Sequence, residues 1–315
     1  MADTIPSAPA PPLTVGDLQG SDRRRRKEAI VGRLFFAAAC VSVLISLLIV
    51  LSLGREAWTF ISNVDLSSLT DIGWFPRRGL YDISTLVVGS LLVTAIAMLV
   101  AGPIGLGAAV YLAEYATPRT RRLLKPIIEI LAGIPSVVLG FFALTWISPN
   151  VVQWLFSDAQ QFNLLAAGIG VGVLTVPLMA SISEDALRSV PRALREASAG
   201  VGATKKTTTL RVVLPAAVSG LVAAFIVSVS RAIGETMVVA IAAGASGGSI
   251  FDTDPTQPGQ TMTAAMASLA AGTDQVRGAS FAFQSLFFVG ALLFVITLLL
   301  NVVADRFVNR FRQRY

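Results

Sequence analysis

The clearest pattern along the chain is a series of long apolar runs separated by polar segments. A helix that crosses the roughly 30 Å hydrocarbon layer of a bilayer needs about 20 apolar residues. Runs of sufficient length cover residues 30–53, 84–112, 123–147, 163–182, 216–243 and 281–304. Because a backbone in lipid must satisfy its own hydrogen bonds, the pattern predicts an all-α integral membrane protein with about six transmembrane helices.

The third run differs from the others because it contains several residues that disturb helices. Pro126, Gly133 and Pro135 lie within it. Proline removes a backbone donor and clashes with the preceding turn, and glycine lowers helix propensity. We therefore expect a kinked or broken helix in this part of the chain.

The basic residues gather on one side of the predicted membrane protein. Basic groups occur at 23–33, 119–125, 188–211 and 306–314, and all of them share one side if there are six spans. Cytoplasmic flanks carry the excess of lysine and arginine, so both termini are predicted to be cytoplasmic.

The first run is longer than a signal-peptide core of roughly 7–15 residues, which favours an uncleaved helix. Residues 1–29 are then expected to form a disordered cytoplasmic leader, and residues 30–315 a transmembrane domain.

Composition narrows the possible functions. The 315-residue chain is 54% hydrophobic and 14% charged, which is too apolar for a single water-soluble core. It has one cysteine, Cys40, and no histidine, so it lacks a disulfide framework, the commonest metal ligands and the commonest general base. No paired carboxylates point to an active site, which argues against a membrane enzyme. The net charge of +6 comes from residues that flank apolar runs, so the expected surroundings are membrane lipid and not nucleic acid.

A long polar segment, residues 184–215, separates the fourth and fifth runs. Residues 191–200 contain good helix formers after a proline, and Gly202 can take the left-handed conformation that ends a helix. A second helical stretch is expected from Thr204 to Pro215. The segment is therefore predicted to form two short helices that meet at a turn on the cytoplasmic side.

Part of this segment resembles the EAA loop of bacterial ABC importer permeases. The residues that carry the likeness are Glu196-Ala197-Ser198, Gly202, Val212 and Leu214-Pro215. Ser198 stands where a second alanine is usual, and Val212 where isoleucine is usual. The resemblance implies a type I ABC importer permease fold whose coupling-helix loop docks on a separate ATPase. It implies ATPase-coupling roles for Glu196, Ala197, Gly202, Leu214 and Pro215.

Two other interpretations of the same segment need to be weighed. It could be an ordinary basic loop in which Gly202 only ends a helix. Residues 200–207 also resemble a phosphate-binding loop, but Lys205 stands where the motif has glycine, and a helix instead of a strand precedes it. The chain is therefore not expected to be an enzyme or to hold a cofactor, and ATP and Mg²⁺ would be bound by the partner ATPase.

The fifth run contains an arginine and a glutamate well inside it. Arg231 and Glu235 are four residues apart, which would place them on one helical face and allow them to pair. A charge near the bilayer centre costs at least roughly 2.5–3.5 kcal/mol, so it normally faces protein, water or another charge. The pair could simply neutralise itself or tie this helix to a neighbour. Alternatively, Arg231, Glu235 and Ser230 could form a translocation pathway in which Arg231 attracts an anion and Glu235 keeps the attraction weak.

Three stretches resemble the phosphate importer permeases, and the PstC branch more than its PstA paralogue. They are AGIPSVVLG at 132–140, SRAIGETM at 230–237 and LLFVITLLLN at 292–301. The resemblance implies a subunit of a phosphate importer in the bacterial plasma (inner) membrane. The implied partners are a PstA-like permease, two PstB-like ATPase subunits and a periplasmic or lipid-anchored PstS-like binding protein. Permeases for molybdate, sulfate or phosphonate are the nearest alternatives, and a secondary anion transporter would not explain the spacing from Glu196 to Pro215.

Overall fold

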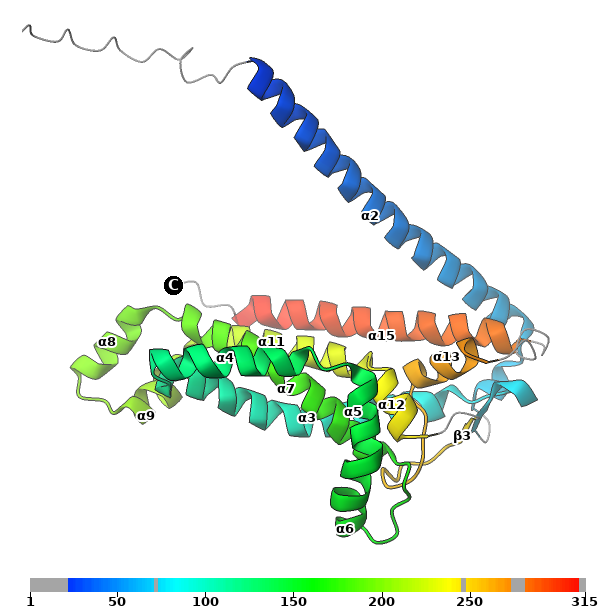
Figure 1. Cartoon of the computed structure of the whole chain (residues 1–315). Coiled ribbons are helices and arrows are strands. Elements are labelled where there is room, and N and C mark those ends of the chain that lie inside the picture. The colour runs from blue at the N-terminus through cyan, green and yellow to red at the C-terminus, as the bar shows by residue number, and fades with distance from the viewer. Residues whose placement is uncertain (1–21, 71–72, 245–247, 273–280, 312–315) are drawn as a thin grey trace, which may run out of the picture. The chain divides into compact units, whose positions relative to one another are not determined.

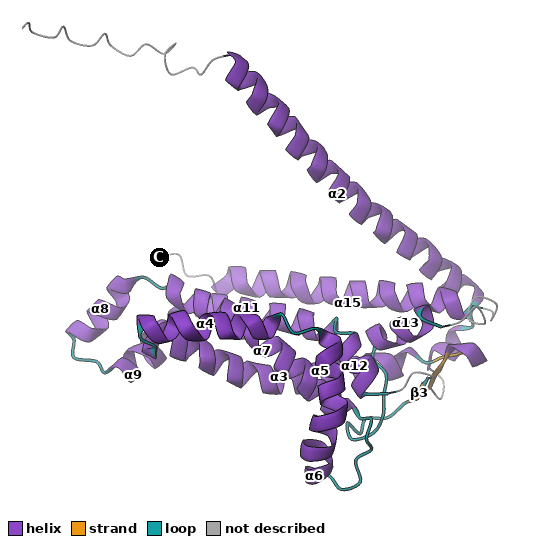
Figure 2. Ribbon diagram, in the orientation of Figure 1, coloured by secondary structure: helices purple, strands orange, loops and turns teal. Residues whose placement is uncertain are grey.

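Helices dominate the structure of this chain. The computed structural model describes residues 22–70, 73–244, 248–272 and 281–311, which are helical apart from three short strands and the connecting loops (Figure 2). The chain divides into two units, Met1–Ser52 and Leu53–Tyr315. The first unit contains most of helix α2 (Asp22–Asn63). Residues 1–21 of the expected leader lie outside the described residues, whereas residues 22–29 form the first turns of α2 and not a disordered segment.

Among the described residues, five helices are long and apolar enough to cross a membrane. They are Arg26–Asn63, Ile83–Tyr115, Ser136–Leu155, Leu164–Ser189 and Ala282–Arg306. A sixth crossing is added if the pair Lys205–Ala216 and Val218–Ile233, which is bent by 70°, forms one span. The predicted all-α membrane fold with about six spans is therefore confirmed.

Helices α3 (Ile83–Val110) and α7 (Leu164–Ser189) form the centre of the second unit and lie against each other along their length. Glycines allow this close approach: a Cβ on Gly168 would lie 2.7 Å from Ile96, and one on Gly172 would lie 2.8 Å from Val100. Such close packing couples α3 and α7, because a displacement of one helix meets atoms of the other with little free space between them. The π-helical segment η3 (Tyr111–Tyr115) continues α3.

The third apolar run is broken where its glycine and prolines predicted a disturbance. Helix α4 (Pro118–Ala132) ends before Gly133, and a new helical segment begins at Ser136 after Pro135. This segment comprises α5 (Ser136–Phe142), η4 (Ala143–Val152) and α6 (Gln153–Leu155). The candidate span is therefore Ser136–Leu155 and not 123–147. Helix α4 has charged residues in its first half and no buried residue, which is why it does not belong to the span.

The fourth and fifth runs also differ from the predicted boundaries. Helix α7 continues to Ser189, because its apolar face extends as far as the buried Leu187. The polar insert therefore starts after α7 and not at residue 184. It contains α8 (Arg192–Gly200), α9 (Lys205–Thr208), the π-helical η5 (Thr209–Val213) and α10 (Leu214–Ala216). The expected span 216–243 is divided into α11 (Val218–Ile233) and α12 (Met237–Ala242).

The end of the unit opposite α8 and α9 is built from loops, short strands and short helices (Figure 1). A three-stranded antiparallel sheet has the order β2 (Leu80–Tyr81), β1 (Gly73–Phe75), β3 (Ser249–Ile250). The buried Trp74 pairs with Tyr81 on one side and with Ser249 on the other. The short elements η1 (Leu66–Thr70), η2 (Pro76–Arg78) and α13 (Met262–Ala270) also belong to the second unit. Its last element is the long helix α15 (Ala282–Phe311).

Candidate functional site

The two short helices predicted in the insert, α8 and α9, form a helical hairpin at one end of the long helices (Figure 1). This hairpin, residues 192–208, is called the knuckle below. Gly202 ends the first helix with φ of 80°, a conformation that is unfavourable for a residue with a side chain. Thr204 then caps α9, because its side chain accepts a hydrogen bond from the backbone N–H of Thr207. The hydroxyls of Ser198 and Thr208 lie 2.8 Å apart and join the two helices. Serine in place of the usual alanine at 198 thus adds a contact within the knuckle.

The structure divides the predicted coupling residues into two groups. Glu196, Ala197 and Gly202 are exposed on the knuckle. Leu214 instead packs against a buried cluster that includes Leu187 and Val213, and the exposed Pro215 lies beside it in α10. Leu214 therefore holds the knuckle against the long helices, whereas the exposed group is free to meet a partner.

Val201, at the tip of the knuckle, is a candidate docking residue that the sequence motif did not indicate. Its side chain is 85% exposed, the largest exposure among the exposed large apolar residues described. An apolar side chain at the tip of a polar hairpin gains from burial against another protein.

Arg195 anchors the knuckle to the rest of the unit, and sequence reasoning missed it. Its Nε and Nη2 atoms donate to Oε1 of Glu114 in η3, at 3.2 and 2.8 Å. Nη1 donates to the carbonyl oxygen of Val190 at 2.6 Å, and Nη2 to that of Leu187 at 2.8 Å. The side chain of Glu114 is 7% exposed, so this charge pair is shielded from water. The guanidinium therefore connects α8 to the ends of both α3 and α7.

A second buried carboxylate, Glu184, joins α4 to α7. Its side chain is 1% exposed and pairs with Arg121 Nε, with Lys125 Nζ at 3.3 Å and with Arg188 Nη1 at 3.9 Å. Burial lowers the pKa of Lys125, but the charges and hydrogen bonds of Glu184 and Asp185 outweigh burial and raise it. Lys125 is thus held as a cation. Sequence reasoning placed Glu184 in the polar insert, although the apolar spacing that continues to Leu187 indicates that the helix extends past it.

The charged residues of the fifth run do not share a continuous helical face as predicted. Helix α11 ends at Ile233, and Glu235 follows the break. The carboxylate of Glu235 is turned inward, where Oε1 accepts the backbone N–H of Met237 at 3.2 Å and so caps the start of α12. Its Oε2 is 3.9 Å from Nη2 of Arg231, which is a long contact.

The three predicted pathway residues point to different neighbours. The side chain of Arg231 is 53% exposed, whereas that of Glu235 is 5% exposed. Ser230 donates a hydrogen bond to Oδ1 of Asn301 in α15 at 3.1 Å. Ser230 therefore ties α11 to α15, Glu235 caps α12, and Arg231 has the most exposed side chain of the three.

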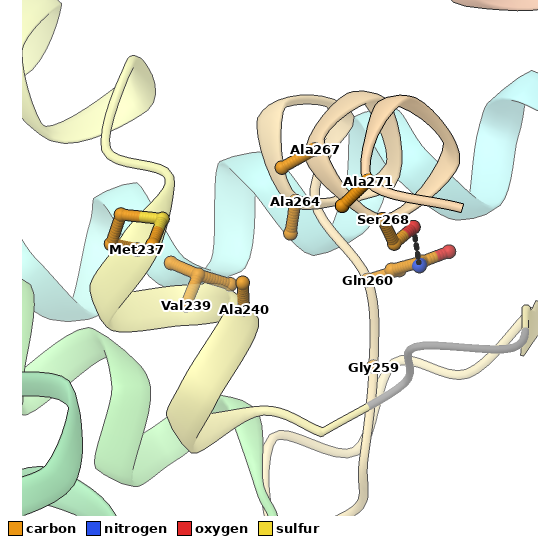
Figure 3. Close-up of a pocket in the computed structure, with 9 residues that line it drawn as sticks. All are labelled: Met237, Val239, Ala240, Gly259, Gln260, Ala264, Ala267, Ser268 and Ala271. Carbon is orange, nitrogen blue, oxygen red and sulfur yellow. Dashed lines mark hydrogen bonds between the residues drawn. The ribbon is translucent and has the colours of Figure 1, made fainter. Parts of the chain in front are cut away.

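A cavity of about 270 Å³ lies between α12 and α13 (Figure 3). Its described lining residues are Met237, Val239, Ala240, Gly259, Gln260, Ala264, Ala267, Ser268 and Ala271. Gln260 donates to the hydroxyl of Ser268 at 3.2 Å, and no charged side chain is among the described lining residues. The described lining of the cavity therefore offers no cationic side chain to an oxyanion.

Comparison with known proteins decides the family. Residues 101–315, more than half of the chain, match the family described as binding-protein-dependent transport system inner membrane component. The chain belongs to this family. It is a multi-pass permease subunit of an ABC importer in the inner membrane, it is not a catalytic subunit, and it works with an ATPase and a binding protein.

Curated relatives of this permease include several phosphate permeases. It is 31% identical over 316 residues to the phosphate transport system permease protein PstC of Mesorhizobium japonicum, which covers 93% of this chain and 94% of that one. It is 33% identical over 262 residues to PstC 1 of Mycobacterium tuberculosis, covering 77% and 76%. A probable ABC transporter permease of Bacillus subtilis, YqgH, is 34% identical over 233 residues, covering 72% and 75%. The resemblance to the phosphate importer permeases is thus confirmed.

A solved structure shows the same fold. A bacterial ABC transporter involved in the import of the acidic polysaccharide alginate contains a chain that matches this permease with a TM-score of 0.62. The match covers 92% of this chain and 100% of that one at 14% identity. The predicted ABC importer permease fold is therefore confirmed, and at this identity the match bears on the fold alone.

Proposed function

We propose that this permease is the PstC-like subunit of an ATP-driven importer of inorganic phosphate. The observation that carries the proposal is the likeness, over 93% of the chain, to a permease named for phosphate transport. PstA 1 of Mycobacterium tuberculosis is 29% identical over 71% of the chain, so it is both less similar and less completely matched. This difference supports the PstC-like assignment over the PstA-like one.

Arg231 is the proposed anion contact of the translocation pathway. A half-exposed guanidinium inside a membrane span is unfavourable by at least roughly 2.5–3.5 kcal/mol unless it meets water, protein or an anion. Glu235 compensates this charge only in part, because its Oε2 lies 3.9 Å from Nη2 of Arg231 and its Oε1 accepts a hydrogen bond from the α12 backbone. The exposed charge of Arg231 can therefore attract a passing oxyanion, while the neighbouring carboxylate weakens the attraction enough for release.

The exposed part of the knuckle is the proposed docking surface for the ATPase. Glu196, Ala197 and Gly202 lie on it beside the exposed Val201, so it offers one acidic and several small or apolar contacts. The basic residues at 23–33, 119–125, 188–211 and 306–314 support a cytoplasmic position for the knuckle and for both termini. The proposed complex contains this chain, a paralogous permease, two ATPase subunits and a periplasmic or lipid-anchored phosphate-binding protein.

Uptake into proteoliposomes tests the substrate and the pathway together. The complex with its binding protein should take up radiolabelled phosphate in an ATP-dependent manner, and Arg231→Gln should abolish most of this uptake while the subunits still copurify. Arg122→Gln is a matched control, because Arg122 is also an exposed arginine but lies in α4 and not in α11. Preferential uptake of molybdate, sulfate or a phosphonate would refute phosphate as substrate. Unchanged uptake by an assembled Arg231→Gln complex would refute the pathway role.

A further inference from the structure

The helix that bears the proposed docking surface is attached to the unit in part by Leu194, which packs, partly buried, against the cluster that includes Leu187 and Val213. Helix α8 has nine residues, and none of them is buried. A helix this short has little stability of its own and depends on contacts with the rest of the protein. The four donor contacts of the Arg195 guanidinium are therefore important for its orientation.

The acceptors of Arg195 lie at the ends of the two closely packed helices α3 and α7. Glu114 lies in η3 at the end of α3, and the carbonyl groups of Leu187 and Val190 lie at the end of α7. Helices α3 and α7 are held together by side chains that pack directly on glycine backbone, as Ile96 does on Gly168. A planar guanidinium that donates to a carboxylate and to two carbonyl groups in different directions fixes both the position of α8 and its rotation about its own axis.

The knuckle is attached differently on its other side. The hydroxyls of Ser198 and Thr208 join α8 to α9, and the chain then passes through η5 and α10 to the 70° bend before α11. Helix α11 carries Arg231. The knuckle thus has one connection to the α3/α7 body and another to the helix with the proposed anion contact.

We infer that Arg195 is a positioning residue for energy coupling: through Glu114 and the end of α7, it makes α8 move as one body with α3 and α7. This inference rests on the proposed docking of α8 to the ATPase. A push on α8 is transmitted to the closely packed α3/α7 pair through the guanidinium. Helix α11, which bears Arg231, packs on α7 where a Cβ on Gly220 would lie 2.5 Å from Ala186, so Arg231 moves with that pair. Without the guanidinium, α8 still docks through its exposed residues but turns without moving α3 and α7.

The transport yield per ATP tests this inference in the reconstituted complex with its binding protein. Arg195→Gln should retain bound ATPase and basal ATP hydrolysis, but substrate uptake per ATP should fall by roughly fivefold or more, within the range typical of coupling between sites. Glu114→Gln should act in the same direction, and Arg195→Lys should restore part of the yield because it keeps the charge. The matched controls Arg122→Gln and Glu129→Gln change exposed residues of α4 and should keep the full yield.

A distance measurement separates this inference from the choice of substrate. Spin labels at the exposed positions Val201 and Leu99, introduced after Cys40→Ser, report the placement of α8 relative to α3 without any substrate. The distance distribution should broaden in Arg195→Gln and stay narrow in Arg122→Gln. An unchanged distribution together with an unchanged yield per ATP would overturn the inference, and so would loss of bound ATPase in Arg195→Gln. A failure of phosphate to support uptake in the unaltered complex would affect only the proposed substrate.

Discussion

Replacing Glu184 should loosen the contact between α4 and α7. Breaking a buried ion pair by removing one partner costs roughly 3–5 kcal/mol, because the other charge is left without compensation. Arg121 and Lys125 are each 29% exposed, and Asp185 still approaches Lys125 at 3.4 Å. Solvent and this second carboxylate reduce the expected loss for Glu184→Ala to about 2–3 kcal/mol of unfolding free energy.

Unfolding by increasing amounts of sodium dodecyl sulfate in mixed micelles measures this loss. Glu129→Ala is the matched control, because Glu129 is an exposed carboxylate of α4, and such changes usually stay within about 0.5 kcal/mol. Glu184→Gln should lie between the two, since the amide oxygen still accepts a hydrogen bond from Arg121 while the charge is lost. A Glu184→Ala variant as stable as the Glu129→Ala control would refute the role assigned to this buried network.

Three further changes test other parts of the structure. Gly202→Val should destabilise the knuckle by about 1–2 kcal/mol, because φ of 80° is unfavourable for a residue with a side chain, and faster proteolysis of the loop would report it. Gly172→Ala should lower stability by about 1–3 kcal/mol in the same micelle titration, because the new Cβ would lie 2.8 Å from Val100; an unchanged midpoint would contradict close α3/α7 packing. Glu235→Ala should remove the cap of α12 and cost about 1 kcal/mol or more, measurable as faster amide exchange at Met237; unaltered exchange would argue against the cap.

The spans and the knuckle could be predicted from sequence because their signals are local. A run of apolar residues indicates a span by its length, and Gly202 indicates a turn because of the backbone conformation that it allows. The break in the third run was visible from Gly133 and Pro135 for the same reason. The end of α7 was missed because its last turns carry exposed polar residues, while buried Leu187 continues the inner face.

The anchoring contacts could not be predicted because their partners are far apart in the sequence. Arg195 and Glu114 are separated by 81 residues, and Arg121 and Glu184 by 63. In a basic segment, nothing local distinguishes an arginine that reaches a buried carboxylate from one that faces water. Arg231 and Glu235 do approach each other, at 3.9 Å, as their four-residue spacing predicted. The continuous helical face was wrong, because that spacing implies one face only if the helix is continuous, and α11 ends at Ile233.

Stimulation of ATP hydrolysis by phosphate is the most direct test of the central claim that this permease couples phosphate import to a separate ATPase. The measurement uses the reconstituted complex with its binding protein and compares the unaltered chain with Glu196→Lys, which reverses the charge on the docking surface. We expect phosphate to accelerate hydrolysis in the unaltered complex and to have no effect when Glu196 is replaced. Hydrolysis that responds to another oxyanion but not to phosphate, or a Glu196→Lys complex that responds like the unaltered one, would contradict the account.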